Sequence, residues 1–258
     1  MPAVVTLTTD FEERDPYAAS TKGVVCAKCP GVHVVDLSHQ IPRQNVPEGA
    51  LFIAGAIPFF PKGTVHLVAV ASGPQPIIVT LDGQHIVCPD NGVVTMLAEQ
   101  HPIQEVHAIT HPDLQPNTEG QIYYGRDVFA PAAAMLAGGT TPAELGEALD
   151  HAAMLDLPKP VRDSKRLVIG QIVHVNRFGT LVTNVHESFL EGAGVKNVEV
   201  GDFSVGGLSK SYTEVPHGSP LALFGSAGYL EIAYNGDRAA TRLDMGNGIR
   251  VNVFTETK

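Results

Sequence analysis

The stretch VVTLTTD, residues 4–10, decides the fold class of this chain. Its apolar and β-branched residues favour a short buried strand, and Asp10 follows where that strand ends. A helix is expected over 17–28, stopped by Pro30, and a second strand over 32–37. Strand, helix and strand in this order are typical of a parallel sheet covered on both faces. The N-terminal part is therefore predicted to be an α/β domain.

The same alternation continues toward residue 156. Further strands and helices are predicted over 50–57 (helix), 65–70 (strand), 77–81 and 86–88 (strands) and 125–137 (helix). Asp82 and Gly83 separate two of these strands and predict a tight hairpin turn. The N-terminal domain is thus expected to occupy residues 1–156.

The sequence changes character at 157–166, which is polar and marked by prolines and is predicted to be a linker. Beyond it the helical pattern fades, and short strands alternate with Gly, Asn and Ser turns, which indicates a small antiparallel barrel or sandwich over 167–258. These strands are predicted over 167–175, 180–185, 198–200, 203–205, 220–224, 229–233 and 249–254.

Charge and hydropathy exclude two classes of partner. The net charge is −10, and residues 1–160 carry all of it, with 7 Lys and Arg against 17 Asp and Glu. An acidic half without any Lys/Arg run repels phosphate backbones, so no nucleic-acid partner is expected. The apolar run over 50–60 contains Gly55 and Pro58 and is shorter than the roughly 20 residues that cross a bilayer. No membrane partner is therefore expected.

The N-terminus and the cysteines predict the compartment. The first residues carry no basic segment before their apolar stretch, so they resemble a buried strand rather than a signal peptide. Three cysteines are too few for a disulfide framework. Cys26 and Cys29 have the spacing of a redox or zinc pair, but two small residues at a helix end are the more common interpretation. A cytoplasmic protein is expected.

Polar residues end three of the predicted strands: Asp10, then Asp36 with His39, and Asp90 with Asn91. Ligands of open α/β sheets bind just beyond the carboxyl ends of the strands. A carboxylate placed there can accept both hydroxyls of a ribose. On spacing alone, the more frequent role of Asp10 and Asp36 is to cap the following turn.

Several segments together resemble the family of S-adenosyl-L-methionine (SAM) hydroxide adenosyltransferases, fluorinases and chlorinases. They are TLTTDF, VVDLSHQIPRQNVPEGA, FFPKGTVHL, CPDNGVVT, YYGRDVFAPAAAMLAGG, FGTLVTNVH and GSAGYLEIAYNG, in family order over nearly the whole chain. The resemblance implies a Rossmann-like N-terminal domain with a mostly parallel seven-stranded sheet, and a C-terminal antiparallel β-barrel. It also implies a homotrimer whose ligand sites lie between the N-domain of one subunit and the C-domain of the next.

The reaction that the resemblance implies is attack by water or halide on the ribose C5′ of SAM, with methionine leaving. The resemblance places substrate binding at Asp10, Asp15, Asn176, Phe178, Thr180, Tyr212, Ser226, Asn235 and Gly236. In it Asp10 binds the ribose hydroxyls, Ser226 the methionine part, and Asn235 with Gly236 the adenine. Phe178 and Tyr212 are placed near the adenine, where rings can stack, although core packing is the alternative for both.

The chain departs from the family at the methionine and adenine contacts. Asn176 stands where the family has an Asp that receives the methionine ammonium, and it provides no charge. Losing a charge-assisted contact of this kind weakens amino-acid recognition by about 1 to 2 kcal/mol. Thr180 replaces an Asn that faces the adenine. A ligand other than SAM itself is therefore an open alternative.

The water-activating residues of the family are also replaced. In the family that this chain resembles, members that activate water carry a set of one Asp, one Arg and one His. Here Ala71 takes the Asp position, no Arg follows, and Tyr124 takes the His position. A neutral pocket cannot lower the pKa of water as that set can. Tyr124 and Gly125 are similar to the Tyr-Gly of chlorinases, in which the glycine widens an anion pocket and helix-start N–H groups could hold a halide. These two residues are the catalytic candidates.

Three functions follow from the resemblance. The first is hydrolysis of SAM to adenosine and L-methionine; the others are a halide-dependent adenosyltransferase and a non-catalytic adenosine- or SAM-binding protein. None needs a metal or cofactor, since SAM is the substrate or ligand. His107 and His111 are expected to be solvated loop residues rather than ligands.

Overall fold

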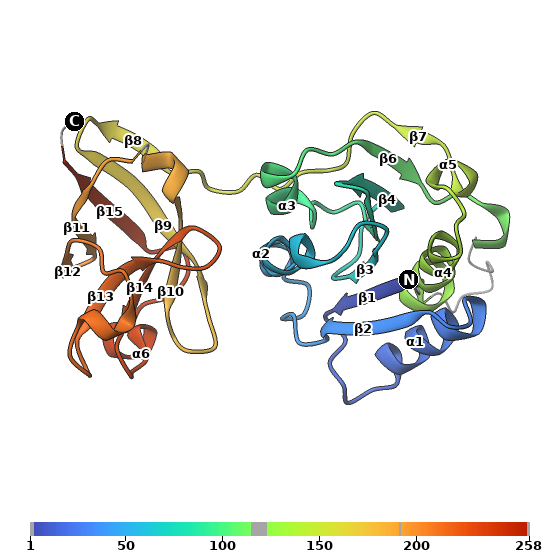
Figure 1. Cartoon of the computed structure of the whole chain (residues 1–258), viewed down its shortest axis with the longest axis horizontal. Helices are drawn as coiled ribbons and strands as arrows, with labels where there is room; N and C mark the ends of the chain where they lie inside the picture. The colour runs from blue at the N-terminus through green and yellow to red at the C-terminus, as the bar shows by residue number, and fades with distance from the viewer. Residues whose placement is uncertain (1–2, 115–122, 191, 257–258) are drawn as a thin grey trace. The chain divides into compact units, whose positions relative to one another are not determined.

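The computed structural model describes residues 3–114, 123–190 and 192–256 (Figure 1). The chain divides into two compact units, Met1–Asp156 and Leu157–Lys258. Within the described ranges, no helix has both the length and the hydropathy needed to cross a bilayer. Each unit has its own hydrophobic core, so each is described separately.

A seven-stranded sheet forms the centre of the first unit, in the order β2-β1-β3-β5-β4-β6-β7. Its strands are β1 Val4–Thr9, β2 His33–Ser38, β3 Val65–Ala69, β4 Pro76–Leu81, β5 Gln84–Pro89, β6 Glu105–Ala108 and β7 Ala148–Leu149. Pairing is parallel among β2, β1, β3 and β5, and antiparallel from β5 through β4 and β6 to β7. Only β4 and β7 thus oppose the other strands, which confirms a mostly parallel sheet.

The central position of β1 follows from its residues. Val5 and Leu7 are fully buried, and the strand's threonines, Thr6, Thr8 and Thr9, are buried as well. The Thr6 hydroxyl lies 2.7 Å from Nδ1 of the buried His66, so this polar group is satisfied inside the sheet. Because β1 pairs on both edges and is covered on both faces, a continuous β-branched and apolar run is favoured there.

Helices cover both faces of the sheet. They are α1 Tyr17–Lys28, α2 Val46–Ala56, α3 Thr95–Gln100, α4 Ala130–Ala137 and α5 Pro142–Leu145, with short 3-10 turns at Ile57–Phe59 and Pro112–Leu114. In Figure 1, α1 and α4 pack together on one side of the sheet and α2 with α3 on the other. Because β1, β2 and β3 run parallel, their carboxyl ends lie at the same edge of the sheet.

Two local predictions differ from the structure in instructive ways. The helix predicted over 50–57 already begins at Val46, because the Asn45 side chain accepts the Glu48 N–H at 3.1 Å and caps it. The helix predicted over 125–137 begins as a π-helical turn, Gly125–Phe129, before α4. The hairpin turn at Asp82 and Gly83 is confirmed, with φ of 47° and 74° as a type I′ turn requires.

The prediction that His107 is a solvated loop residue is wrong. It lies on β6 and is 6% exposed. Its Nδ1 is 3.1 Å from the Gly146 carbonyl oxygen, and its Nε2 is 3.2 Å from Glu105 Oε2. The short strand carries the ring inward, where these two partners satisfy it.

The second unit is an eight-stranded antiparallel sheet that curls into a nearly closed barrel (Figure 1). Its strands are β8 Val161–Ser164, β9 Leu167–Val175, β10 Leu181–His186, β11 Val195–Val200, β12 Phe203–Gly206, β13 Pro220–Phe224, β14 Tyr229–Tyr234 and β15 Arg250–Thr255. Helix α6 Ala239–Leu243 and 3-10 turns at Glu187–Leu190 and Tyr212–Glu214 complete it. Strand β8 lies within the predicted linker and pairs with β9. The antiparallel barrel is confirmed.

Candidate functional site

Asp10 lies directly after β1 and joins two loops of the first unit. Its Oδ2 accepts the backbone N–H of Gln44 at 2.9 Å and that of Ala71 at 3.1 Å. Gln44 and Ala71 have φ of 60° and 57°, a conformation that costs a non-glycine residue about 1 kcal/mol or more. The strained backbone aims both N–H groups at one carboxylate oxygen. Among the described residues, no hydrogen bond engages the other oxygen, Oδ1.

Asp36 belongs to a chain of contacts that ends beneath Asp10. The buried His39 has Nδ1 2.9 Å from the Thr9 hydroxyl and Nε2 3.0 Å from Asp36 Oδ1, although the second contact is poorly aligned for a hydrogen bond. Asp36 Oδ2 accepts a bond from Lys22 at 2.8 Å. Burial raises the pKa of Asp36, but the contacts from Lys22 and His39 outweigh it and hold the pKa below its ordinary value. Asp36 thus supports the strand end.

A small cavity of about 80 Å³ lies at the end of β3. It is lined by Ala71, Ser72, Gly73, Gln75, Pro76, Pro89, Tyr124 and Phe129. Among the described residues, its lining contains hydroxyl and amide groups but no carboxylate or imidazole. Ala71 also donates its N–H to Asp10, so the cavity and the carboxylate share one residue. The structure therefore places Tyr124 and Ala71 in one neutral pocket.

Gly125 is buried beside that pocket and fills a packing role. A Cβ there would lie 3.0 Å from the Tyr123 hydroxyl and 3.1 Å from the Phe11 ring. At the helix start, the N–H groups of Arg126 and Asp127 both donate to the Tyr123 carbonyl, at 3.0 and 2.8 Å. These two N–H groups are already used, so neither is available to hold a halide.

The other acidic and phenolic groups near this site are the side chains of Asp127, Tyr123 and Asp15. Asp127 accepts the Tyr123 N–H at 3.0 Å and pairs with Arg126, which together keep the pKa of Asp127 below its ordinary value. Burial raises the pKa of Tyr123 to about 12, so its hydroxyl stays protonated. Asp15 is exposed in the loop before α1, and no hydrogen bond or ion pair among the described residues joins it to Asp10.

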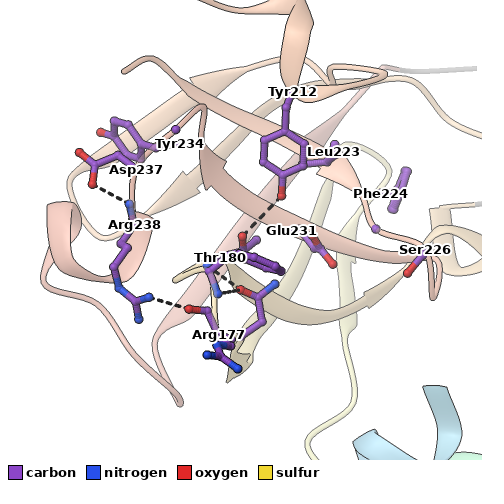
Figure 2. A pocket seen from close by; sticks show the side chains of 14 residues that line it. Arg177, Thr180, Tyr212, Leu223, Phe224, Ser226, Glu231, Tyr234, Asp237 and Arg238 are labelled. Carbon is purple, nitrogen blue, oxygen red and sulfur yellow. Dashed lines mark hydrogen bonds between the residues drawn. The ribbon is translucent and has the colours of Figure 1, made fainter. Parts of the chain in front are cut away.

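A larger cavity, of about 780 Å³, opens in the barrel unit (Figure 2). Six of the predicted ligand residues line it: Asn176, Phe178, Thr180, Tyr212, Ser226 and Gly236. The turn between β9 and β10 supplies three of them because the Asn176 side-chain oxygen accepts the N–H groups of Phe178 and Thr180, each at 3.0 Å.

The aromatic rings of this cavity are open to a ligand. Phe178 is 79% exposed at the tip of the turn, so the core-packing alternative is wrong for this residue. Tyr212 is 39% exposed, and its hydroxyl lies 3.5 Å from that of Thr180. An exposed ring beside a hydroxyl pair is suited to stacking on a heterocyclic base while offering it hydrogen bonds. Figure 2 shows the Tyr212 and Thr180 hydroxyls meeting across the cavity.

Of the predicted ligand residues in the barrel unit, Asn235 is the one that is not in the cavity lining. Its side-chain amide donates to the Val215 carbonyl at 2.8 Å, and its N–H donates to Ser219 at 2.9 Å. It therefore holds the loop before β13. Gly236, which follows it, has φ of 80°, and any Cβ there would collide with the His217 ring.

Sequence reasoning missed several cavity residues. Arg238 donates to the Arg177 carbonyl at 2.6 Å, and Asp237 pairs with Arg242. Glu231 is half-buried in the wall, and burial raises its pKa. A signal for Glu231 was present, since it is the only charged residue in the otherwise apolar and aromatic strand β14.

The first unit has a carboxylate at the end of a strand, beside a small pocket. The barrel unit has a cavity that exposes an aromatic ring. These features are typical of a two-domain protein that binds a small organic molecule. Two family models match the chain. The SAM hydroxide adenosyltransferase N-terminal domain matches residues 5–146, and the C-terminal domain of the same family matches residues 170–252. The chain belongs to the SAM hydroxide adenosyltransferase family.

Similar proteins cover the whole chain. A protein of Thermus thermophilus named (R)-S-adenosyl-L-methionine hydrolase is 33% identical over 95% of this chain and 97% of its own length. A fluorinase of an Actinoplanes species is 28% identical over 98% of this chain and 99% of its own. The crystal structure of an uncharacterized conserved protein from Thermotoga maritima superposes with a TM-score of 0.86 at 29% identity, covering 97% of this chain and 99% of its own.

Proposed function

We propose that this protein binds SAM and hydrolyses it to adenosine and L-methionine. Asp10 would bind the ribose hydroxyls, and the barrel cavity would receive the adenine and the methionine part. Relatives named SAM hydrolase that align along their full length support this activity over other small-molecule functions.

The observation that carries the proposal is the position of Ala71. Its N–H holds the Asp10 carboxylate at 3.1 Å, and the same residue lines the cavity of about 80 Å³. A sugar bound by Asp10 would therefore lie beside a small cavity whose polar side chains are Ser72, Gln75 and Tyr124. Such a cavity has room for water, since one molecule needs roughly 10–15 Å³ of this kind of volume.

The chemistry that this arrangement supports is displacement by positioned water. The water oxygen would form a bond to ribose C5′ while the C5′–S bond breaks, its electron pair leaving on the methionine sulfur and the water proton passing to solvent. None of the described residues that line the cavity carries a carboxylate or imidazole, so acceleration by these residues would come from alignment and from exclusion of bulk water. The sulfonium is already a good leaving group, and no step requires a metal or cofactor.

A single assay tests the activity. Purified protein is incubated with SAM, with and without chloride, and the products are resolved by mass. We expect adenosine and methionine in both samples. Formation of 5′-chloro-5′-deoxyadenosine would show that the reaction is halogenation and not hydrolysis. Unchanged SAM, together with a rise in Tm on addition of adenosine, would indicate a binding protein without catalysis.

We also propose that the protein is a cytoplasmic homotrimer, in which Asp10 of one subunit and the barrel cavity of the next serve one ligand. The family resemblance supports this assembly, and the free Cys26, Cys29 and Cys88 agree with a reducing compartment. Sedimentation of the purified protein should give three times the chain mass. A monomer at micromolar concentration would contradict the shared site.

A further inference from the structure

His39 is a buried side chain near Asp10 that the proposed reaction does not use. It directly follows β2 and is 4% exposed. Its ring has two polar neighbours: Nδ1 lies 2.9 Å from the Thr9 hydroxyl, and Nε2 lies 3.0 Å from Asp36 Oδ1. A buried imidazole between two polar groups is held in one orientation, so it can in turn fix the residues that it contacts.

Residues on both sides of Asp10 are bonded to the segment that carries His39. On the N-terminal side, the Thr9 hydroxyl contacts the His39 ring, and the Thr9 carbonyl accepts the Ile41 N–H at 3.3 Å. On the C-terminal side, the Glu12 N–H donates to the His39 carbonyl at 2.7 Å. The segment after β2 therefore holds the chain before and after Asp10.

The Thr9 hydroxyl extends the His39 contact around the turn at Asp10. It accepts the Phe11 N–H at 3.4 Å while it also contacts the His39 ring, because a hydroxyl is both a donor and an acceptor. The residue before Asp10 and the residue after it are thus joined through one oxygen that His39 holds. The orientation of the Asp10 carboxylate, with Oδ2 bound to two backbone N–H groups, depends on this turn.

We propose that His39 is a positioning residue: through the Thr9 hydroxyl it holds the Asp10 carboxylate in the orientation that accepts the ribose hydroxyls. This inference rests on the proposed function, in which Asp10 binds the ribose. A carboxylate that accepts two hydroxyls must be placed to within about 0.5 Å, so a contact that fixes its turn affects binding. Since His39 is almost fully buried, its effect reaches the ligand through Asp10 and should appear only with ligands that carry the ribose diol.

Two nucleosides isolate the ribose contact. Adenosine carries the 2′ and 3′ hydroxyls and 2′,3′-dideoxyadenosine carries neither, so the ratio of their affinities measures the contribution of the diol. In calorimetric titration, wild-type protein should prefer adenosine by about tenfold or more, as expected for hydrogen bonds to a charged group. In His39→Leu this preference should fall to about threefold or less, through weaker adenosine binding, with dideoxyadenosine within about twofold of wild type. A loss of packing alone would weaken both nucleosides equally.

Further variants separate positioning from folding. The amide of asparagine places a polar atom where imidazole has Nδ1, whereas that of glutamine lies nearer to the place of Nε2. His39→Asn should therefore keep the wild-type preference for adenosine, and His39→Gln and Thr9→Val should lose it as His39→Leu does. Thr6→Val is the matched control, because the Thr6 hydroxyl makes the same kind of contact on the same strand, 2.7 Å from Nδ1 of the buried His66. Its preference for adenosine should equal that of wild type.

The results that overturn the inference differ from those that overturn the proposed function. A wild-type preference for adenosine in both His39→Leu and Thr9→Val, or a reduction of equal size in Thr6→Val, removes the positioning role and leaves the ribose contact of Asp10 in place. If wild-type protein binds both nucleosides equally, or binds neither, the ribose contact is wrong and the proposed function falls with it. If His39→Leu does not fold, equal preferences in His39→Asn and His39→Gln overturn the inference instead.

Discussion

At the scale of single residues, Asp10 does two things at once. One carboxylate oxygen joins the loops that carry Gln44 and Ala71, and the proposed ribose contact would use the other. Capping and ligand binding, which are alternatives on spacing alone, are therefore compatible in this residue. Strained backbone at Gln44 and Ala71 persists because both N–H groups have an acceptor there.

We expect Asp10→Ala to abolish adenosine binding and to lower stability. The variant removes the proposed ribose acceptor and leaves two backbone N–H groups without their partner, at a cost of about 1–3 kcal/mol for each that stays buried. Asp10→Asn is the matched control for folding, since its amide oxygen can still accept the N–H groups. Calorimetric titration and thermal unfolding measure the two effects, and adenosine affinity equal to wild type in Asp10→Ala would show that the ribose binds elsewhere.

Glu231 predicts a stability that depends on pH. Its pKa is raised in the folded protein above the ordinary value of 4.5, so the folded state holds this proton more tightly than the unfolded state. Stability from this group is then greatest at low pH and falls as pH rises from about 4.5 through the raised pKa. Ligand-free Glu231→Gln should therefore have a higher Tm than wild type at mildly alkaline pH, and the difference should vanish below pH 4.5. A lower Tm at alkaline pH would reveal a stabilising partner for Glu231.

At the scale of elements, the turn between β9 and β10 shapes the barrel cavity. The side-chain oxygen of Asn176 accepts the backbone N–H groups of Phe178 and Thr180. These bonds hold Phe178 exposed and the Thr180 hydroxyl toward that of Tyr212. The cavity therefore depends on the turn geometry as much as on the residues that line it.

Asn176→Ala should destabilise the barrel unit and weaken ligand binding together. Two N–H groups lose their acceptor, which corresponds to about 1–3 kcal/mol, and Phe178 loses its fixed position. Asn176→Asp keeps an acceptor oxygen at the same place, so its Tm should stay close to that of wild type. Thermal unfolding and adenosine titration of the two variants check this prediction. If Asn176→Ala has the same Tm as Asn176→Asp, the side-chain oxygen has no structural role.

At the scale of the whole molecule, the proposed trimer predicts complementation between impaired variants. Asp10→Ala damages the N-terminal unit and Asn176→Ala the barrel unit. If a site takes one unit from each of two subunits, co-expression of the two variants in equal amounts should restore about one quarter of the sites to wild type. Hydrolysis at SAM concentrations far below the weakened Kd measures the recovery. Recovery no greater than the sum of the separate variants would mean that each site is built within one chain.

The sequence by itself determined the class of fold and many of the helices and strands. Helix α1 occupies the predicted residues 17–28, and strands β9 and β13 match their predicted ranges, because hydrophobic periodicity and Gly or Pro boundaries are local signals. Six of the residues that line the barrel cavity could also be named, since the resemblance to the family places ligand contacts at Phe178, Thr180 and Tyr212 among others.

Only the tertiary structure decided which polar groups are already satisfied. Asn235 donates to the Val215 carbonyl, Asp10 accepts the N–H groups of Gln44 and Ala71, and Glu231 is left without a partner among the described residues. Hydrogen bonds between segments far apart in the chain depend on three-dimensional proximity, which no local pattern encodes. Burial then sets the energy of each charge, and this is why Glu231, one acidic residue among 27 Asp and Glu in the sequence, stands out only in the folded protein.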